Sequence, residues 1–167
     1  MWLAILSARC IREWLIWPLT PNIWRVSVVI AAIVDTGPLV ALLDDSEAHH
    51  VWTKSSLSPL TLPLLTCEAV LTEALFLLSA EAKAPLQIRA LLQSNALRVA
   101  VFGDADWSRI LDLMTHYHDV PMSLADSCLV RLSELQPKAK VVTLDADFRI
   151  YRRNRNQEIP LLMPARQ

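Results

Sequence analysis

The sequence has only two glycines among 167 residues and no apolar run long enough to cross a membrane. With 53% hydrophobic residues, this composition excludes a disordered chain and favours a helix-rich domain with a substantial core. The cysteines Cys10, Cys67 and Cys128 are odd in number and widely spaced. We therefore expect neither a disulfide framework nor a cysteine metal site, and we predict a reduced, cytoplasmic compartment.

An excess of basic residues is also missing. The chain has 16 Lys and Arg against 17 Asp and Glu, and three of these bases and one of these acids precede Asp35. That leaves 13 bases and 16 acids, a net charge of −3, in the rest of the chain. No overall positive field is available to hold a polyanion.

Residues 1–27 differ from the remainder and hold four of the six tryptophans. Arginines and one glutamate interrupt their apolar runs, and Met1 to Ser7 has none of the positive charges that begin a secretory signal. Two interpretations are open: an amphipathic arm that packs on a neighbour, or upstream sequence included through a misplaced start. We favour the second, with one domain over residues 28–167, because the buried strand that follows needs nothing before it.

The stretch from Val28 to Leu43 begins with β-branched and small apolar residues and changes at Asp35. It predicts a buried central strand followed by a short helix with Pro38 in its first turn. Asp35 then lies at the carboxyl end of the strand, where open α/β sheets place their ligand crevice. The simpler interpretation is that Asp35 only caps the helix.

Two further acids are predicted to lie on apolar helix faces. Helical spacing over residues 66–79 places Glu73 beside Ala69, Val70, Phe76 and Leu77. Over residues 122–135 it places Asp126 beside Met122, Leu129 and Val130, with Ser123 as a cap. An ionised carboxylate on a buried face is unfavourable unless it is paired or bound to a metal.

A fourth acid repeats the setting of Asp35. Val141 and Val142 predict a strand that Thr143 and Leu144 extend, and Asp145 ends it before one helical turn. Asp147, two residues on, is a weaker candidate. The other expected elements are helices over residues 44–58, 83–97 and 107–114, a strand over 97–102 and an edge strand over 159–163.

These four segments together resemble a known family. Asp35 in IVDTGPLVALL, Glu73 in LTEALFLL, Asp126 in SLADSCLV and Asp145 in VVTLDADF are similar, in order and spacing, to the acids of PIN-domain ribonucleases, and most closely to VapC-type toxins of toxin–antitoxin pairs. The resemblance covers Val28 to Met163. It implies a three-layer α/β/α sandwich on a small, mainly parallel sheet, with the four acids as catalytic residues and ligands of Mg²⁺ or Mn²⁺.

The resemblance further implies an endoribonuclease that acts on RNA, with a protein antitoxin and a second copy of the chain as partners. Thr143 and Asp147 are predicted to support the site. The cluster of Arg149, Arg152 and Arg153 just beyond Asp145 is predicted to contact RNA phosphates, or alternatively acidic residues of a protein partner.

The residues themselves are consistent with this chemistry. Two carboxylates about 4 Å apart repel by about 4 kcal/mol at an effective dielectric constant near 20, so converging acids need a cation to stay ionised. Ligands that offer only oxygen suit Mg²⁺ or Mn²⁺. Two alternatives are a silent interaction protein of the same fold and a phosphoacceptor receiver-like domain. The second is weaker because no lysine follows Lys140.

Overall fold

The computed structural model describes residues 30–165, so the predicted arm of residues 1–27 lies outside the described residues. In chain order the elements are β1 (Ala32–Val34), α2 (Thr36–Leu43), α3 (His50–Leu57), β2 (Leu64–Cys67), α4 (Glu68–Leu77), α5 (Ala84–Gln93), β3 (Leu97–Ala100), α6 (Asp104–His116), α7 (Leu124–Leu135), β4 (Lys140–Val142), the 3-10 helix η2 (Ala146–Arg149), β5 (Arg152–Arg153), β6 (Gln157–Glu158) and β7 (Leu161–Leu162). In this part of the chain no helix has the length and apolarity needed to cross a membrane.

Five short strands form a parallel sheet in the order β3-β2-β1-β4-β7. The central strand β1 is the predicted buried one, since Ala32, Ile33 and Val34 are at most 1% exposed. A strand covered on both faces must be apolar throughout, which the sequence provides. β7 confirms the predicted edge strand, while β5 and β6 form a separate antiparallel pair.

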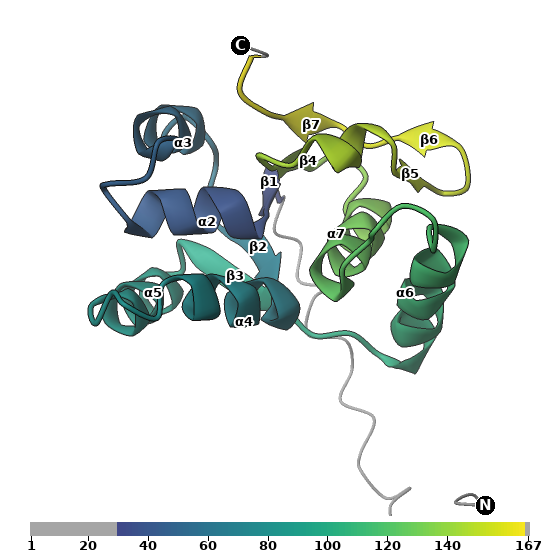
Figure 1. Ribbon diagram of the computed structural model, residues 1–167, viewed down its shortest axis with the longest axis horizontal. Coiled ribbons are helices and arrows are strands. Elements are labelled where there is room, and N and C mark those ends of the chain that lie inside the picture. Colours follow the sequence, from purple (N-terminus) through teal and green to yellow (C-terminus); the bar gives the residue numbers. More distant parts are fainter. Residues whose placement is uncertain (1–29, 166–167) are drawn as a thin grey trace, which may run out of the picture.

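Helices cover both faces of this sheet (Figure 1). α2, α3 and α5 lie on one side, and α7 packs against β1, β2 and β4 on the other, with α6 behind it. The predicted three-layer α/β/α sandwich is therefore confirmed, and its sheet is parallel in every described pairing.

Two predicted helix starts are wrong. The helix that was expected from residue 44 begins at His50. Thr66 and Cys67 end strand β2, and the helix that was expected from residue 66 begins at Glu68. Thr66 pairs with Val99 of β3, and its buried hydroxyl donates to the carbonyl of Val34 at 3.0 Å. Pairing on both sides of β2 stabilises the extended conformation here against the local helical pattern.

Parallel pairing brings the strand ends to one edge of the sheet. Val34 pairs with Val142, and the backbone N–H of Asp35 donates to the carbonyl of Val142 at 3.0 Å. The residues that follow β1 and β4 are therefore neighbours, although more than one hundred residues separate them in the sequence. This is the edge at which the sequence predicts a ligand crevice.

A network of charged side chains fixes α7 against α6. Glu134 accepts hydrogen bonds from Arg109 at 2.7 Å, from Arg131 at 2.9 Å and from the backbone of Asn154 at 3.0 Å. Arg131 also pairs with Asp106 at 2.8 Å. Burial opposes ionisation of Glu134, but the hydrogen bonds from Arg109, Asn154 and Arg131 outweigh it and hold the pKa of this carboxyl below its ordinary value.

We expect Glu134→Ala to lower the free energy of unfolding by about 2–3 kcal/mol, because it leaves two arginines without their shared partner. The stabilisation from Glu134 is present above its ordinary pKa and is lost as the pH falls through its lowered value. Urea unfolding at pH 7 measures the loss. Glu81→Ala, which removes an exposed partner of Lys83 at 4.0 Å, should change stability by less than about 1 kcal/mol. Equal effects of the two variants would contradict this account.

Candidate active site

Asp35 is buried at the carboxyl end of β1, where it is 6% exposed. One carboxylate oxygen accepts from the backbone N–H of Thr36 at 2.6 Å and caps α2, so the predicted capping role is confirmed. The other oxygen accepts from the hydroxyl of Thr143 at 2.6 Å. Capping therefore occupies only one of the two oxygens of Asp35.

Thr143 connects the ends of the two central strands. Its side chain is fully buried, and its hydroxyl accepts from the backbone N–H of Asp145 at 2.9 Å while donating to Asp35. Asp145 is exposed and accepts from the backbone N–H of Asp147 at 2.8 Å, which starts η2. Asp147 is half-buried beside this turn. The predicted supporting position of Thr143 thus lies between two of the candidate acids.

Glu73 approaches the same edge from α4. Its carboxylate accepts a hydrogen bond at 3.0 Å from the hydroxyl of Thr36, the residue that directly follows Asp35. The apolar surroundings predicted for Glu73 are only partly present. Val70 lies on the buried face of α4, but Phe76 and Leu77 are 76% and 60% exposed. Glu73 is therefore half-buried at the border of that face.

Asp126 lies in the first turn of α7. It forms a capping box with Ser123, in which one oxygen of Asp126 accepts from the backbone N–H of Ser123 at 2.8 Å and the hydroxyl of Ser123 accepts from the N–H of Asp126 at 3.1 Å. Ser123 is thus confirmed as the cap. Met122, Leu129 and Val130 are buried around it, as predicted.

The four acids act on one another electrostatically. Burial raises the pKa of Asp35 to about 6, against the hydrogen bonds from Thr143 and Thr36, and the charges of Asp126 and Asp145 add to the rise. Burial likewise raises the pKa of Asp126, with contributions from the charges of Asp145 and Glu73. A cation placed among these groups would relieve the repulsion.

The donor chemistry fits Mg²⁺ or Mn²⁺, since each candidate ligand is a carboxylate. The side chains are not drawn into one coordination sphere, however. Within residues 30–165, no three His, Cys, Asp or Glu side chains stand close enough together to hold an ion. Cation binding would therefore require the less constrained acids to move toward Asp35, whose carboxylate is fixed at both oxygens.

The three candidate arginines differ in their bonding. Arg152 donates to the carbonyls of Arg149, Ile150 and Tyr151, and Arg153 donates to those of Ser133 and Pro137. Arg149 is exposed, and its guanidinium makes no hydrogen bond to the described part of the chain. Arg149 is consequently the most available of the three for a phosphate group.

Sequence reasoning missed one residue of this edge, Thr36, and one unusual buried residue, Tyr151. Thr36 follows Asp35 directly, and a hydroxyl at the first helical position is a signal that could have been used. Tyr151 is fully buried, yet its phenol oxygen has no hydrogen-bond partner in the described residues. In the sequence it is indistinguishable from a core aromatic residue.

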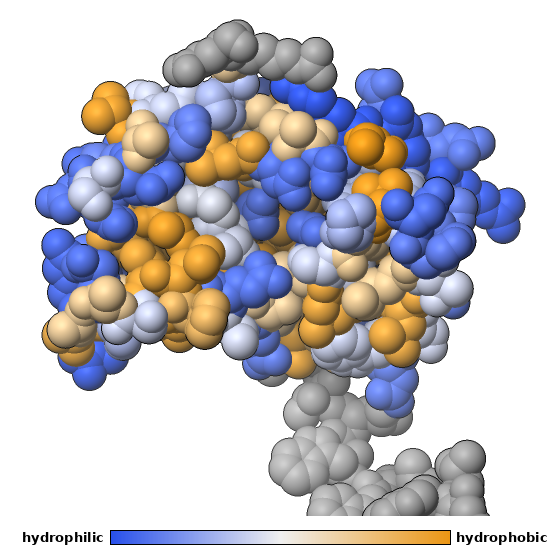
Figure 2. Space-filling view, viewed as in Figure 1, coloured by the Kyte–Doolittle hydropathy of each residue, from blue (hydrophilic) through white to orange (hydrophobic). Residues whose placement is uncertain are grey.

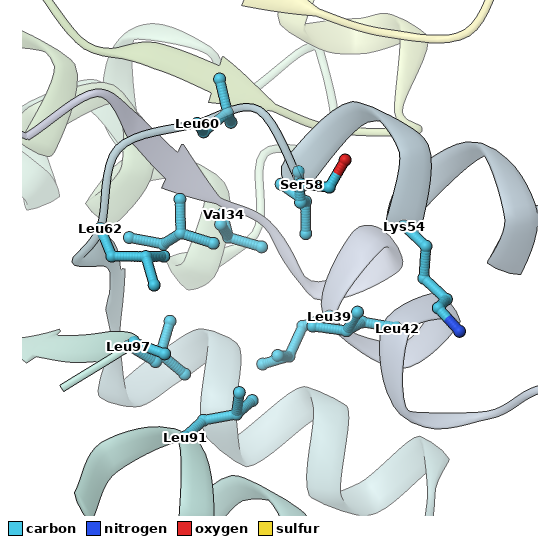
Figure 3. A pocket seen from close by; sticks show the side chains of 12 residues that line it. Val34, Leu39, Leu42, Lys54, Ser58, Leu60, Leu62, Leu91 and Leu97 are labelled. Atoms are coloured by element: carbon cyan, nitrogen blue, oxygen red, sulfur yellow. The ribbon is translucent and has the colours of Figure 1, made fainter. Parts of the chain in front are cut away.

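A separate cavity of about 320 Å³ is lined mainly by apolar side chains (Figure 3). Leucines from α2, α3 and the starts of β2 and β3 line it, with Lys54 and Ser58 beside them. None of the four acids lines it. Exposed apolar side chains also gather over α4 and α5 (Figure 2), namely Leu75, Phe76, Leu77, Leu86 and Leu92.

Comparison with known proteins agrees with the fold. The family model of the PIN domain matches residues 32–154. VapC20 of Mycobacterium tuberculosis, a toxin that cleaves the sarcin-ricin loop, matches with a TM-score of 0.63 and 18% identity over 70% of this chain and 92% of that chain. A toxin–antitoxin complex from Klebsiella pneumoniae matches with a TM-score of 0.55 and 17% identity over 71% of this chain and 90% of that chain. A search of curated proteins gives no significant match.

The raised pKa of Asp35 leads to a prediction about the metal-free protein. Between the ordinary value of 3.8 and the folded value of about 6, the folded state holds a proton that the unfolded state releases, so stability falls as the pH rises through this window. We expect Asp35→Asn to raise the free energy of unfolding at pH 8 by about 1–3 kcal/mol and to flatten its pH dependence.

Urea unfolding in chelator at pH 5 and pH 8 measures both effects. Asp45→Asn is the matched control, because Asp45 is an exposed aspartate, and it should leave the pH dependence unchanged. A lower stability of Asp35→Asn at pH 8 would contradict the electrostatic account.

Proposed function

Because the chain belongs to the PIN domain family, we propose that it is a metal-dependent endoribonuclease and the toxin of a toxin–antitoxin pair. The observation that carries this proposal is the hydrogen-bonded series Asp145–Thr143–Asp35 at the carboxyl edge of the sheet. It joins a buried acid to an exposed one, and burial together with neighbouring acids makes the buried charge unfavourable without a cation.

The catalytic roles follow from the position of each acid. Asp35 is the fixed ligand, since Thr36 and Thr143 hold both of its oxygens. Asp145, which is exposed, and Asp126, which has one oxygen free of hydrogen bonds from the described residues, can turn toward it. Glu73, held by Thr36, completes the set. A bound Mg²⁺ or Mn²⁺ would supply Lewis-acid stabilisation of a phosphodiester and a water of lowered pKa.

Arg149 is the proposed contact for an RNA phosphate. It is exposed, it follows Asp145 by four residues, and its guanidinium has no bond to the described residues. Arg152 and Arg153, also predicted as RNA contacts, hold the segment in place through backbone carbonyls and can add their positive charge to the same area. The chain has no general basic field, so the substrate would be bound locally.

The antitoxin is the proposed protein partner. One similar solved structure is a toxin–antitoxin complex, and the exposed apolar side chains over α4 and α5 give a surface of the kind that protein partners cover (Figure 2). A second copy of the chain is the other proposed partner of this apolar surface. Analytical ultracentrifugation of the chain alone and with its antitoxin separates these two arrangements.

One observation favours the alternative of a silent interaction protein with the same fold. The acids of the described region are not assembled into a coordination sphere. The two functions differ in whether RNA is cleaved when Mg²⁺ or Mn²⁺ is added, so the following variant tests both.

We expect Asp35→Asn to stay folded, because an amide oxygen still caps α2, and to lose Mg²⁺-dependent RNA cleavage by at least about a hundredfold. It should also relieve growth arrest on expression without the antitoxin. Asp45→Asn should cleave as the wild type does. Full toxicity of a folded Asp35→Asn variant would overturn the nuclease mechanism and support the interaction protein.

Thr143 gives an independent prediction. Thr143→Val deletes the hydroxyl between Asp35 and Asp145, and we expect it to reduce cleavage by about 10- to 100-fold. Thr143→Ser keeps the hydroxyl and should retain most activity. The test is a comparison of kcat for the two variants with one RNA substrate. A loss in Thr143→Ser with full activity in Thr143→Val would show that the packing of the threonine methyl group, and not its hydroxyl, sustains the site.

A further inference from the structure

Basic residues are concentrated in two segments of the chain. Residues 149–157 contain four arginines and residues 136–140 contain two lysines, and neither segment contains an acid. These six are nearly half of the 13 Lys and Arg that follow Asp35. Although the chain has no general basic field, it therefore has local positive charge in these two places.

Hydrogen bonds hold the two basic segments together at the end of α7. The guanidinium of Arg153 donates to the carbonyls of Ser133 and Pro137 at 3.0 and 3.1 Å. The backbone N–H of Asn154 donates to the carboxylate of Glu134 at 3.0 Å. The hairpin formed by β5 and β6 is thus fixed against the carboxyl end of α7 and the loop that follows it (Figure 1).

The tip of this hairpin, residues 154–156, has an unusual backbone. Asn154 and Arg155 both have positive φ angles, of 46° and 77°. Asparagine adopts this left-handed region more readily than most residues and glycine adopts it without strain, whereas a long side chain such as arginine is disfavoured there. The geometry of the turn therefore does not explain an arginine at position 155.

The charge of the tip is available to a partner. Arg155 and Lys138 are both exposed, and the ion pairs formed within residues 30–165 include neither of them. The nearest acid of the hairpin is Glu158, which lies opposite Arg152 in the ladder and outside the tip. In Figure 2, hydrophilic side chains gather at this end of the molecule.

The basic surface is separate from the candidate acids but is joined to them by α7. Asp126 lies in the first turn of this helix, and Ser133, to which the hairpin is bonded, lies seven residues further on. Seven residues of α-helix measure about 10 Å. A stacked nucleic-acid strand covers that distance with about three nucleotides, at about 3.4 Å each.

We propose that the tip of the β5–β6 hairpin, with Lys138 beside it, is a second surface that contacts RNA phosphates, and that Arg155 is its principal contact. The proposal rests on the RNA-directed function proposed above and extends the contact area beyond Arg149. Contacts to phosphates position a strand without selecting its sequence. The surface would hold RNA that continues past the edge that carries the acids.

The test measures binding of the full chain, in chelator, to a fluorescein-labelled oligouridylate of about 20 nucleotides, because phosphate contacts do not depend on base sequence. Fluorescence anisotropy at several salt concentrations gives the affinity and its salt dependence. We expect Arg155→Asn to weaken binding and to reduce the slope of log K against log salt by about 0.7, the value for one phosphate contact on a single strand. Its melting temperature should stay the same or rise, because asparagine tolerates the left-handed backbone.

Two variants control for charge and for position. Arg155→Lys keeps the positive charge and should keep the wild-type slope. Arg89→Gln removes an exposed arginine of α5 and should change neither affinity nor slope. A wild-type slope in Arg155→Asn, or an equal loss in Arg89→Gln, would overturn the proposal. Unchanged RNA binding in Arg155→Asn together with weaker binding of polyglutamate would assign the hairpin to an acidic protein partner instead.

The stoichiometry shows whether one strand reaches both basic positions. We expect one RNA per chain, and a slope reduced by about 1.4 when Arg149→Gln and Arg155→Asn are combined. Two RNA molecules per chain would contradict a single strand that passes from the acids to the hairpin.

The same proteins separate this proposal from the proposed function. Absence of RNA binding to the wild type would overturn both. RNA binding that depends on Arg155, in a chain that cleaves no RNA with Mg²⁺ or Mn²⁺, would support the hairpin surface and remove the nuclease. Cleavage that requires Asp35, with RNA binding that is insensitive to Arg155, would preserve the nuclease and remove only the hairpin surface.

Discussion

The hydrogen bond from the hydroxyl of Thr143 to the carboxylate of Asp35 connects the ends of the two central strands at the edge that carries the acids. It depends on the parallel register of β1 and β4, which sets Val34 beside Val142. A shift of that register by one residue would turn each of these side chains to the opposite face of the sheet. The site therefore depends on the packing of a five-stranded sheet and not on any local motif.

Burial and the neighbouring charges act in the same direction on Asp35, against the hydrogen bonds that hold it. The surroundings that fix Asp35 also desolvate it, and the neighbouring acids add repulsion, so the pKa of Asp35 rises to about 6. The protein maintains an unfavourable charge at its centre, whereas the Glu134 network at the far end of α7 neutralises its buried acid with two arginines. Only the first arrangement leaves a buried acid without a basic partner among the described residues, which is typical of functional sites.

The sequence predicted most of the helices and the position of Asp35 at the end of β1, because an apolar run that stops abruptly at an acid is a local signal. Strand β4 ends at Val142, three residues before Asp145, so the predicted extension of this strand to Asp145 is wrong. The local pattern misplaced the start of α4, since the pairing of Thr66 with β3 is not visible locally. It also overestimated the apolar surroundings of Glu73, because helical spacing identifies the neighbours of a residue without showing whether another element covers them. Phe76 and Leu77 are such uncovered neighbours.

Thr36 and Tyr151 show why the hydrogen bonding of a side chain is harder to predict from the sequence than the positions of the acids. The bond from Thr36 to Glu73 joins residues 37 positions apart, and the orphaned hydroxyl of Tyr151 becomes visible only once the aromatic cluster is packed. The two side chains also differ in kind. The hydroxyl of Thr36 donates a hydrogen bond to Glu73, while the hydroxyl of Tyr151 has no hydrogen-bond partner in the described residues. Asp35, Glu73 and Asp126 are therefore each held by a hydrogen bond that forms on folding, from Thr143, Thr36 and Ser123 respectively.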